Sequence, residues 1–328
     1  MTSNDTINLF FERPETDRFI KNDRHLKRLV RPYWERLRRK RTTGFAESFR
    51  LLVLALERTG HRVRINDRDH ARANPHEPVG LVGFPVLIEG WDLPNPALIG
   101  PSLYDHPQVR PHLLDTLGFQ KYVVLGDWHR RLFETEYGDA CVPWFAAIDP
   151  TEWPDTTDRS KKLDFLIYDK VYRDRDLQSR YLIAPIEAEL RRRGLTFETL
   201  RYEHHAQDDY RAALGRAKGM IFLCEHESQG IAYQEAMMSG VPILAWNFGI
   251  LMDPIWKVFH TEPVAASSVP FFSDMCGETF GHARDFASSL DRFTERRSSY
   301  EPRRYMLENM SQEKSARLYV EAYRSVMR

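Results

Sequence analysis

Short apolar runs alternate with amphipathic segments along the first half of the chain. Phe45, Phe49, Leu52 and Leu56 recur every three or four positions, which predicts one face of a helix that Gly60 ends. A second helix is expected over 127–137. The apolar runs predict buried strands, and they lie at 7–11, 61–65, 79–90, 96–103 and 121–127, while the apolar stretch at 140–149 ends this half.

The second half repeats this alternation after a polar stretch at 150–162, which is the best candidate for a linker. Strands are expected at 163–169, 196–202, 219–225 and 241–247. Helices are expected at 176–193, 207–217 and 231–239, and one long helix at 308–327. Strands that alternate with helices predict an α/β protein with parallel sheets covered by helices on both faces. A chain of 328 residues has room for two such domains.

Charge changes this picture at one place. The chain has no formal net charge, but residues 21–41 carry ten Lys or Arg and only two Asp or Glu. This basic segment also contains Tyr33 and Trp34, a combination that suits an anionic membrane surface or a lipid-diphosphate acceptor. The alternative is an ordinary solvated helix. The overall balance argues against a nucleic-acid partner.

Cysteine content and hydropathy indicate the compartment. The three cysteines form no CxxC pair, and the N-terminus lacks the basic and apolar regions of a signal peptide. The longest apolar stretch, 241–252, is shorter than the roughly 20 residues that span a bilayer. We therefore expect a cytoplasmic protein, with peripheral contact at the inner face of the membrane through 21–41.

The segment 224–249 carries the clearest chemistry. A buried strand ends at Cys224, a loop carries Glu227, and Gly230 opens a helix that bears Glu235. The free N–H groups of Ser228, Gln229, Gly230 and Ile231 at the start of this helix suit a phosphate, whereas carboxylates suit hydroxyl groups. Phosphate together with hydroxyls describes a sugar nucleotide.

The sequence ESQGIAYQE resembles the Glu-x7-Glu motif of retaining GT-B glycosyltransferases of the family-4 type, with Glu227 as the first glutamate and Glu235 as the second. The following AMMSGVPILA is similar to that family's helix end and next strand. The resemblance implies two Rossmann-like domains whose parallel sheets face each other across a cleft. It implies an acceptor-side domain at 1–155, completed by a C-terminal helix within 308–328, and a nucleotide-sugar domain at 156–307.

The family's other donor-binding residues match less closely. It has a Gly-Arg pair after a strand and a Lys five positions later, and both cations bind the donor diphosphate. Here Asp169 replaces the glycine, while Lys170 and Arg175 supply the cations in exchanged order and Arg173 is a rival to Arg175. Gly44 is all that remains of a glycine-rich loop.

The resemblance also implies roles for these residues. Glu227 would hold the sugar hydroxyls and Glu235 the ribose. Lys170 and Arg175 would stabilise the leaving group together with residues 228–231, and His106 is the candidate for a histidine that faces the sugar. About 30 residues inserted before the first shared helix are the largest departure from the family.

The resemblance predicts a retaining transferase that moves a sugar from a UDP- or GDP-sugar to a glycan, a lipid-linked acceptor or a small molecule. No essential metal is expected, because the acidic pairs at 67–69 and 174–176 lack suitable surroundings. Two alternatives remain open. One is a non-catalytic protein that binds sugar nucleotides or serves as a scaffold, which the eroded glycine loop favours. The other is a GT-B epimerase that acts on the nucleotide sugar itself.

Overall fold

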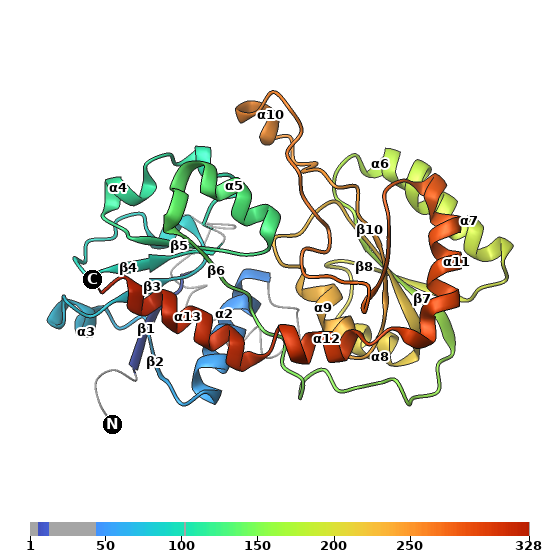
Figure 1. Ribbon diagram of the computed structural model, residues 1–328, viewed down its shortest axis with the longest axis horizontal. Coiled ribbons are helices and arrows are strands. Elements are labelled where there is room, and N and C mark those ends of the chain that lie inside the picture. The colour runs from blue at the N-terminus through green and yellow to red at the C-terminus, as the bar shows by residue number, and fades with distance from the viewer. Residues whose placement is uncertain (1–5, 13–43, 102, 328) are drawn as a thin grey trace, which may run out of the picture.

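The computed structural model describes residues 6–12, 44–101 and 103–327 and contains two parallel β-sheets (Figure 1). The basic segment 21–41 lies outside the described residues. The first sheet has six strands in the order β2-β1-β3-β4-β5-β6. Its strands are β1 (Thr6–Phe10), β2 (Arg62–Ile65), β3 (Val79–Leu81), β4 (Ala97–Ile99), β5 (Lys121–Val124) and β6 (Cys141–Pro143).

Helices connect these strands and cover the sheet. They are α2 (Gly44–Arg58), α3 (Arg68–Ala73), α4 (Leu113–Leu117) and α5 (Asp127–Tyr137), with 3-10 turns at Pro85–Leu87, Pro107–Val109 and Gly138–Ala140. The strand predicted over 79–90 is only partly correct: it ends at Leu81, and Pro85 instead opens a 3-10 turn. Proline lacks the N–H that a central strand must donate, which accounts for the early end.

The second sheet has five parallel strands in the order β11-β10-β9-β7-β8. They are β7 (Leu163–Lys170), β8 (Phe197–Arg201), β9 (Ala217–Cys224), β10 (Ile243–Trp246) and β11 (Gly277–Phe280). The helices of this half are α6 (Arg175–Gln178), a π-helical turn at Ser179–Ile183, α7 (Ala184–Arg192), α8 (Gln207–Arg216), α9 (Ile231–Met238), α10 (Trp256–Phe259) and α11 (Phe286–Arg296), with 3-10 turns at Ala283–Asp285 and Arg297–Ser299.

Two consecutive helices carry the chain back to the first sheet along one side of the molecule (Figure 1). They are α12 (Pro302–Asn309) and α13 (Gln312–Ser325). The helix predicted over 308–327 is present as α13 but begins later, at Gln312, and α12 before it was not predicted. The helix breaks at Met310, and Ser311 restarts it by accepting a hydrogen bond from the Lys314 N–H at 3.2 Å. Ser311 is therefore the N-cap of α13, which explains why this helix begins at Gln312.

The end of α13 is fixed against the first sheet. It packs on α2, and the Tyr323 hydroxyl accepts the Asn8 N–H at 2.9 Å and donates to the Pro78 carbonyl. Tyr319 approaches β3 so closely that a Cβ on Gly80 would lie 2.3 Å from its hydroxyl oxygen. The C-terminal helix is therefore structurally part of the first half. The domain boundary near residue 155 stays a prediction.

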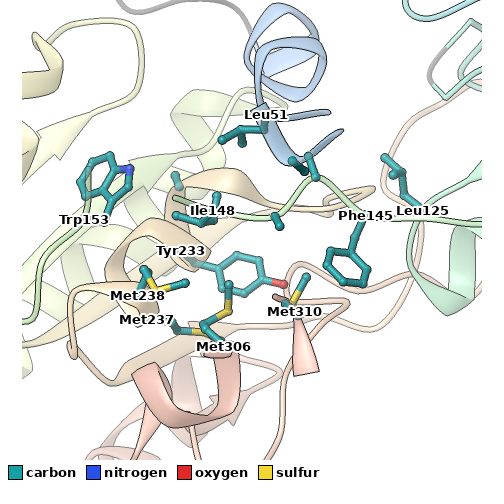
Figure 2. Packing of buried hydrophobic residues seen from close by; sticks show 14 of the residues in the cluster. Leu51, Leu125, Phe145, Ile148, Trp153, Tyr233, Met237, Met238, Met306 and Met310 are labelled. Carbon is teal, nitrogen blue, oxygen red and sulfur yellow. The ribbon is translucent and has the colours of Figure 1, made fainter. Parts of the chain in front are cut away.

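One hydrophobic core runs from the first half into the second. Leu51 of α2 belongs to the same buried cluster as Tyr233 and Met237 of α9 and Met306 of α12. Figure 2 shows the methionines of α9 and α12 facing each other beside Ile148 and Trp153, which belong to the segment that joins the two sheets. Burial of this shared core stabilises the contact between the two halves.

Candidate functional site

A cavity of about 210 Å³ lies between the two halves. Parallel strands all end at the same edge of their sheet, and this edge is where α/β proteins bind ligands. The first half contributes the start of α2 and Leu125, the residue after β5. The second half contributes the ends of β7 and β8, the loop after β9 and the first turns of α9. The lining includes Gly44, Lys170, Tyr202, Glu227, Ser228, Gln229, Gly230, Ile231 and Glu235.

An ion pair forms the floor of this cavity. Lys170 Nζ lies 2.5 Å from Glu227 Oε1 and 4.8 Å from the ring centre of Tyr202. Burial alone would lower the pKa of Lys170, but the Glu227 carboxylate outweighs it, and the net effect raises the pKa above its usual value. Lys170 is therefore a fixed positive charge at neutral pH. A phosphate entering here would compete with Glu227 for that charge and leave the carboxylate free to accept hydroxyls.

Gly230 allows the loop to turn into α9 without a side chain. Its φ is +85°, in the left-handed region, and a Cβ there would lie 2.1 Å from Tyr233 Cε1. The first intrahelical bond of α9 runs from the Gln234 N–H to the Gly230 carbonyl. The N–H groups before it have no acceptor within the helix and point toward the helix start, where an anion is stabilised.

The first half holds the backbone of this loop in place. The Trp128 indole N–H donates to the Glu227 carbonyl at 2.8 Å, and the Gly126 N–H donates to the Ser228 carbonyl at 3.2 Å. The Glu227 N–H donates to the Ser267 carbonyl at 2.9 Å. The position of the first motif glutamate thus depends on residues from both sides of the cavity.

The Gln229 side chain joins the two halves directly. Its Oε1 accepts the Ala146 N–H at 2.8 Å, and its Nε2 donates to the Ala146 carbonyl at 2.6 Å. Gln234 supports it, since Gln229 Nε2 also lies 2.9 Å from Gln234 Oε1. Gln229 was predicted to bind the donor. That prediction concerns its backbone N–H and stays a prediction, whereas its side-chain amide attaches the loop to the connecting segment.

Glu235 lies on the first turns of α9 and is 2% exposed. It lines the same cavity as Glu227, so the structure brings both motif glutamates together. Glu47 of α2 lines the opposite wall, where Arg50 pairs with it at 2.6 Å.

Arg175 is absent from the cavity lining. Both of its terminal nitrogens lie 2.6 Å from the carboxylate oxygens of Asp169, which is buried at the end of β7. These hydrogen bonds raise the pKa of Arg175. Its rival Arg173 pairs with Asp253. The residue that replaces the family's glycine thus binds the cation that was expected to bind the diphosphate.

His106 also lies away from the cavity. It is fully buried, stacks on Phe259 with ring centres 4.6 Å apart, and has its Nε2 2.8 Å from His260 Nε2. Its Nδ1 accepts the Gln108 N–H. Burial, followed by the nearby His260, lowers the pKa of His106 to about 4. A neutral His106 therefore carries its proton on Nε2 and donates it to His260.

Sequence reasoning missed two residues of the site. Tyr202 directly follows β8 and Trp128 opens α5 after β5, so each stands at a carboxyl end of a strand. That position was readable from the sequence and is the signal that could have found them. The loop from β10 to β11, which supplies Ser267, carried no such signal.

Within the described ranges, no group of three or more His, Cys, Asp or Glu side chains is placed to hold a metal ion. The same part of the chain contains no helix with the length and apolar character needed to cross a bilayer.

The architecture matches solved structures at low sequence identity. A crystal structure of TarM aligns at TM-score 0.53 and 11% identity, over 75% of this chain and 54% of that one. The apo form of WaaB, described as a lipopolysaccharide outer core galactosyltransferase, aligns at TM-score 0.51 and 11% identity, over 98% and 99%. The fold is GT-B. The GT-B fold predicted from the sequence is thereby confirmed.

A complex of an S. aureus TarM mutant with Fondaparinux, alpha-GlcNAc-glycerol and UDP also has the GT-B fold. It aligns at TM-score 0.54 and 11% identity, over 75% of this chain and 55% of that one. The present chain spans about half the length of the TarM chains and nearly all of WaaB. No family model matches the sequence, and no curated protein does.

Proposed function

We propose that this protein is a retaining glycosyltransferase that moves a sugar from a nucleotide-sugar donor to a carbohydrate or lipid-linked acceptor. One observation carries the proposal: Lys170, Glu227, Gly230 and Glu235 line one cavity between the facing ends of two parallel sheets. Gly44 lines it from the other half. These residues come from segments far apart in the sequence, and the resemblance had singled out each of them.

The donor diphosphate would bind at Lys170 and at the start of α9, with Glu227 on the sugar hydroxyls and Glu235 on the ribose. Entry of the diphosphate would separate Lys170 from Glu227, which frees both for the donor. The bond from the anomeric carbon to the diphosphate then breaks while the acceptor oxygen bonds to the same face of that carbon. The acceptor's proton passes to the departing nucleoside diphosphate. Lys170 and the helix start stabilise the charge that develops there.

The similar structures support the classes of donor and acceptor. UDP is present in the TarM complex, and WaaB is described as a galactosyltransferase of lipopolysaccharide. We propose a UDP- or GDP-sugar and no essential metal, because Lys170 and the helix start supply positive charge at the diphosphate. We also propose a cytoplasmic location, with the segment 21–41 contacting anionic lipid.

A second candidate function is binding of a nucleotide sugar without transfer. Asp169 holds Arg175 in the described structure, so only one of the two expected cations lines the cavity. A nucleotide-sugar epimerase with the same fold would also use this cavity. The reaction products separate the three functions: transfer needs an acceptor, epimerisation changes the sugar without one, and a binding protein releases no product.

The test follows nucleotide release from a panel of nucleotide sugars, with and without acceptor extract. We expect Glu227→Gln to lower kcat/KM by about 100-fold or more, because it removes a charge that acts on the reacting sugar. Glu295→Gln, on the exposed end of α11, is the matched control and keeps wild-type activity. Donor binding without turnover by any acceptor would favour the binding protein, and sugar isomerisation without acceptor would favour the epimerase.

Metal dependence needs a separate measurement. We expect a chelator to leave the rate of nucleotide release unchanged. A rate that falls with chelator and returns on addition of a divalent cation would contradict the metal-free mechanism.

A further inference from the structure

A second cavity, of about 820 Å³, lies at the amino edge of the five-stranded sheet. It is lined by the linker residues Asp155 and Lys161, by Lys218 at the start of β9, and by the segment from Arg297 to Glu308. Strand β9 begins at this cavity and ends beside the donor cavity. The two cavities thus lie at opposite ends of one strand.

The walls contain both segments that connect the two halves, here called the two passages: the linker that leaves the first half and helix α12 that leads back to it. Asp155 and Lys161 belong to the outgoing linker, whereas Arg303 belongs to the returning helix α12. Arg303 joins them by donating to the carbonyls of Trp153, at 2.8 Å, and Met238. Both connections between the halves therefore line this cavity.

Most charges around the cavity compensate one another. Arg304 pairs with Glu301 at 3.0 Å and with Glu308 at 2.8 Å. Lys218 pairs with Asp164 at 2.7 Å.

Two cations are left without an ion pair among the described residues. Lys161 donates only to neutral oxygens, the Thr156 hydroxyl at 2.9 Å and the Leu214 carbonyl at 3.2 Å. Burial, and then the positive charge of Arg159, lower the pKa of Lys161. Arg297 lines the same cavity, is half-buried, and forms no ion pair within the described ranges. Asp155 of the same cavity acts on Lys161 from a longer distance, but neither cation has an ion-pair partner among the described residues. Partly buried positive charge of this kind favours binding of an anion.

We propose that this cavity is a binding site for a small phosphate-bearing anion, held by Lys161 and Arg297. Guanidinium and ammonium groups are the usual phosphate ligands of proteins, and the volume lies within the roughly 300–1,000 Å³ of small-molecule sites. The site does not depend on the proposed transferase activity.

The test measures binding of inorganic pyrophosphate to the full chain at constant ionic strength. Pyrophosphate can also enter the donor cavity, so binding is measured in a Lys170→Met background, which removes the cation there. We expect Arg297→Gln in that background to weaken pyrophosphate binding at least tenfold. Arg284→Gln, a highly exposed arginine of the same half, is the matched control and should leave binding unchanged.

Three results would overturn the proposal. Absence of pyrophosphate binding in the Lys170→Met protein is the first, and equal affinity with and without Arg297→Gln is the second. The third is an equal loss in the Arg284→Gln control, which would show that general surface charge attracts the anion. Arg297 makes no side-chain hydrogen bond within the described ranges, so its substitution should leave the fold intact, which circular dichroism checks.

Discussion

Gly230 stands where the chain admits no side chain, for two separable reasons. Its φ of +85° strains any L-residue, and a Cβ would lie 2.1 Å from the Tyr233 ring. That ring cannot easily move, because its hydroxyl accepts the Phe271 N–H at 3.0 Å. Gly249 has nearly the same φ, +88°, but a Cβ there meets nothing within 4 Å.

We expect Gly249→Ala to lower the free energy of unfolding by about 1 kcal/mol, from backbone strain alone. Gly230→Ala should lower it by about 1–3 kcal/mol more, because overpacking adds to the strain. Urea denaturation of both variants gives the difference. Equal losses would mean that the Tyr233 ring yields and that close packing does not restrict this position.

The structure brings together in one cavity the predicted residues that belong to a contiguous motif. Glu227, Gly230 and Glu235 keep a fixed spacing on one loop and helix, so the motif carries their geometry with it. Arg175 and His106 depend instead on neighbours. Asp169 binds the first and His260 the second, and neither pairing follows from spacing along the chain.

At the scale of helices and strands, the first and last residues were predicted well where the neighbouring sequence itself marks the end of the element. Helix α5 was expected over 127–137 and is found at those residues, because apolar and polar positions alternate cleanly between two glycines. The restart at Ser311 was missed, and so were β11 and α11. The two middle residues of β11 are only half-buried, so the strand lacks a continuous apolar run. Its pairing with β10 is a long-range contact that no local pattern shows.

The segment bearing α10 projects from the second half and packs against the first through His260 and Phe259 (Figure 1). His106 receives both contacts in its neutral form. An unfolded histidine takes up a proton near pH 6.5, whereas folded His106 does so only near pH 4. Stability is therefore lost as the pH falls through this window, and the buried His129, whose pKa burial also lowers to about 4, adds to the loss.

Protonation of each of these histidines should lower the free energy of unfolding by about 2 kcal/mol when the pH falls from 7 to 5. His106→Phe keeps the stacking on Phe259 but removes the titrating ring, so the variant should lose about 2 kcal/mol less than the wild type over that range. His129 remains and keeps part of the pH dependence. Chemical denaturation at both pH values measures the loss, and an unchanged loss in the variant would refute the assignment to His106.

At the scale of the whole molecule, the two halves are joined by a few buried polar contacts within the shared core. From the opposite half, the Gln229 side chain hydrogen-bonds both the backbone N–H and the backbone carbonyl of Ala146. Ser315 of α13 adds a bond to the Phe145 carbonyl at 2.6 Å. The segment that follows β6 is therefore held by the loop before α9 on one side and by α13 on the other.

Gln229→Leu should lower the free energy of unfolding by about 2–4 kcal/mol, because it leaves a buried N–H and a buried carbonyl without partners. It should also weaken UDP binding, since the loop that carries Glu227 loses one of its attachments and keeps those from Trp128 and Gly126. Gln120→Leu, with an exposed side chain, is the matched control for both measurements and should change neither. Wild-type stability in Gln229→Leu would show that water replaces the glutamine amide.

Strand β9 separates the two cavities by its full length, with Lys218 at one end and Cys224 at the other. Occupants of the two cavities would therefore never exclude each other sterically. A phosphate compound held at the amino edge would therefore not compete with a ligand of the first cavity, and raising the concentration of that ligand would not displace it.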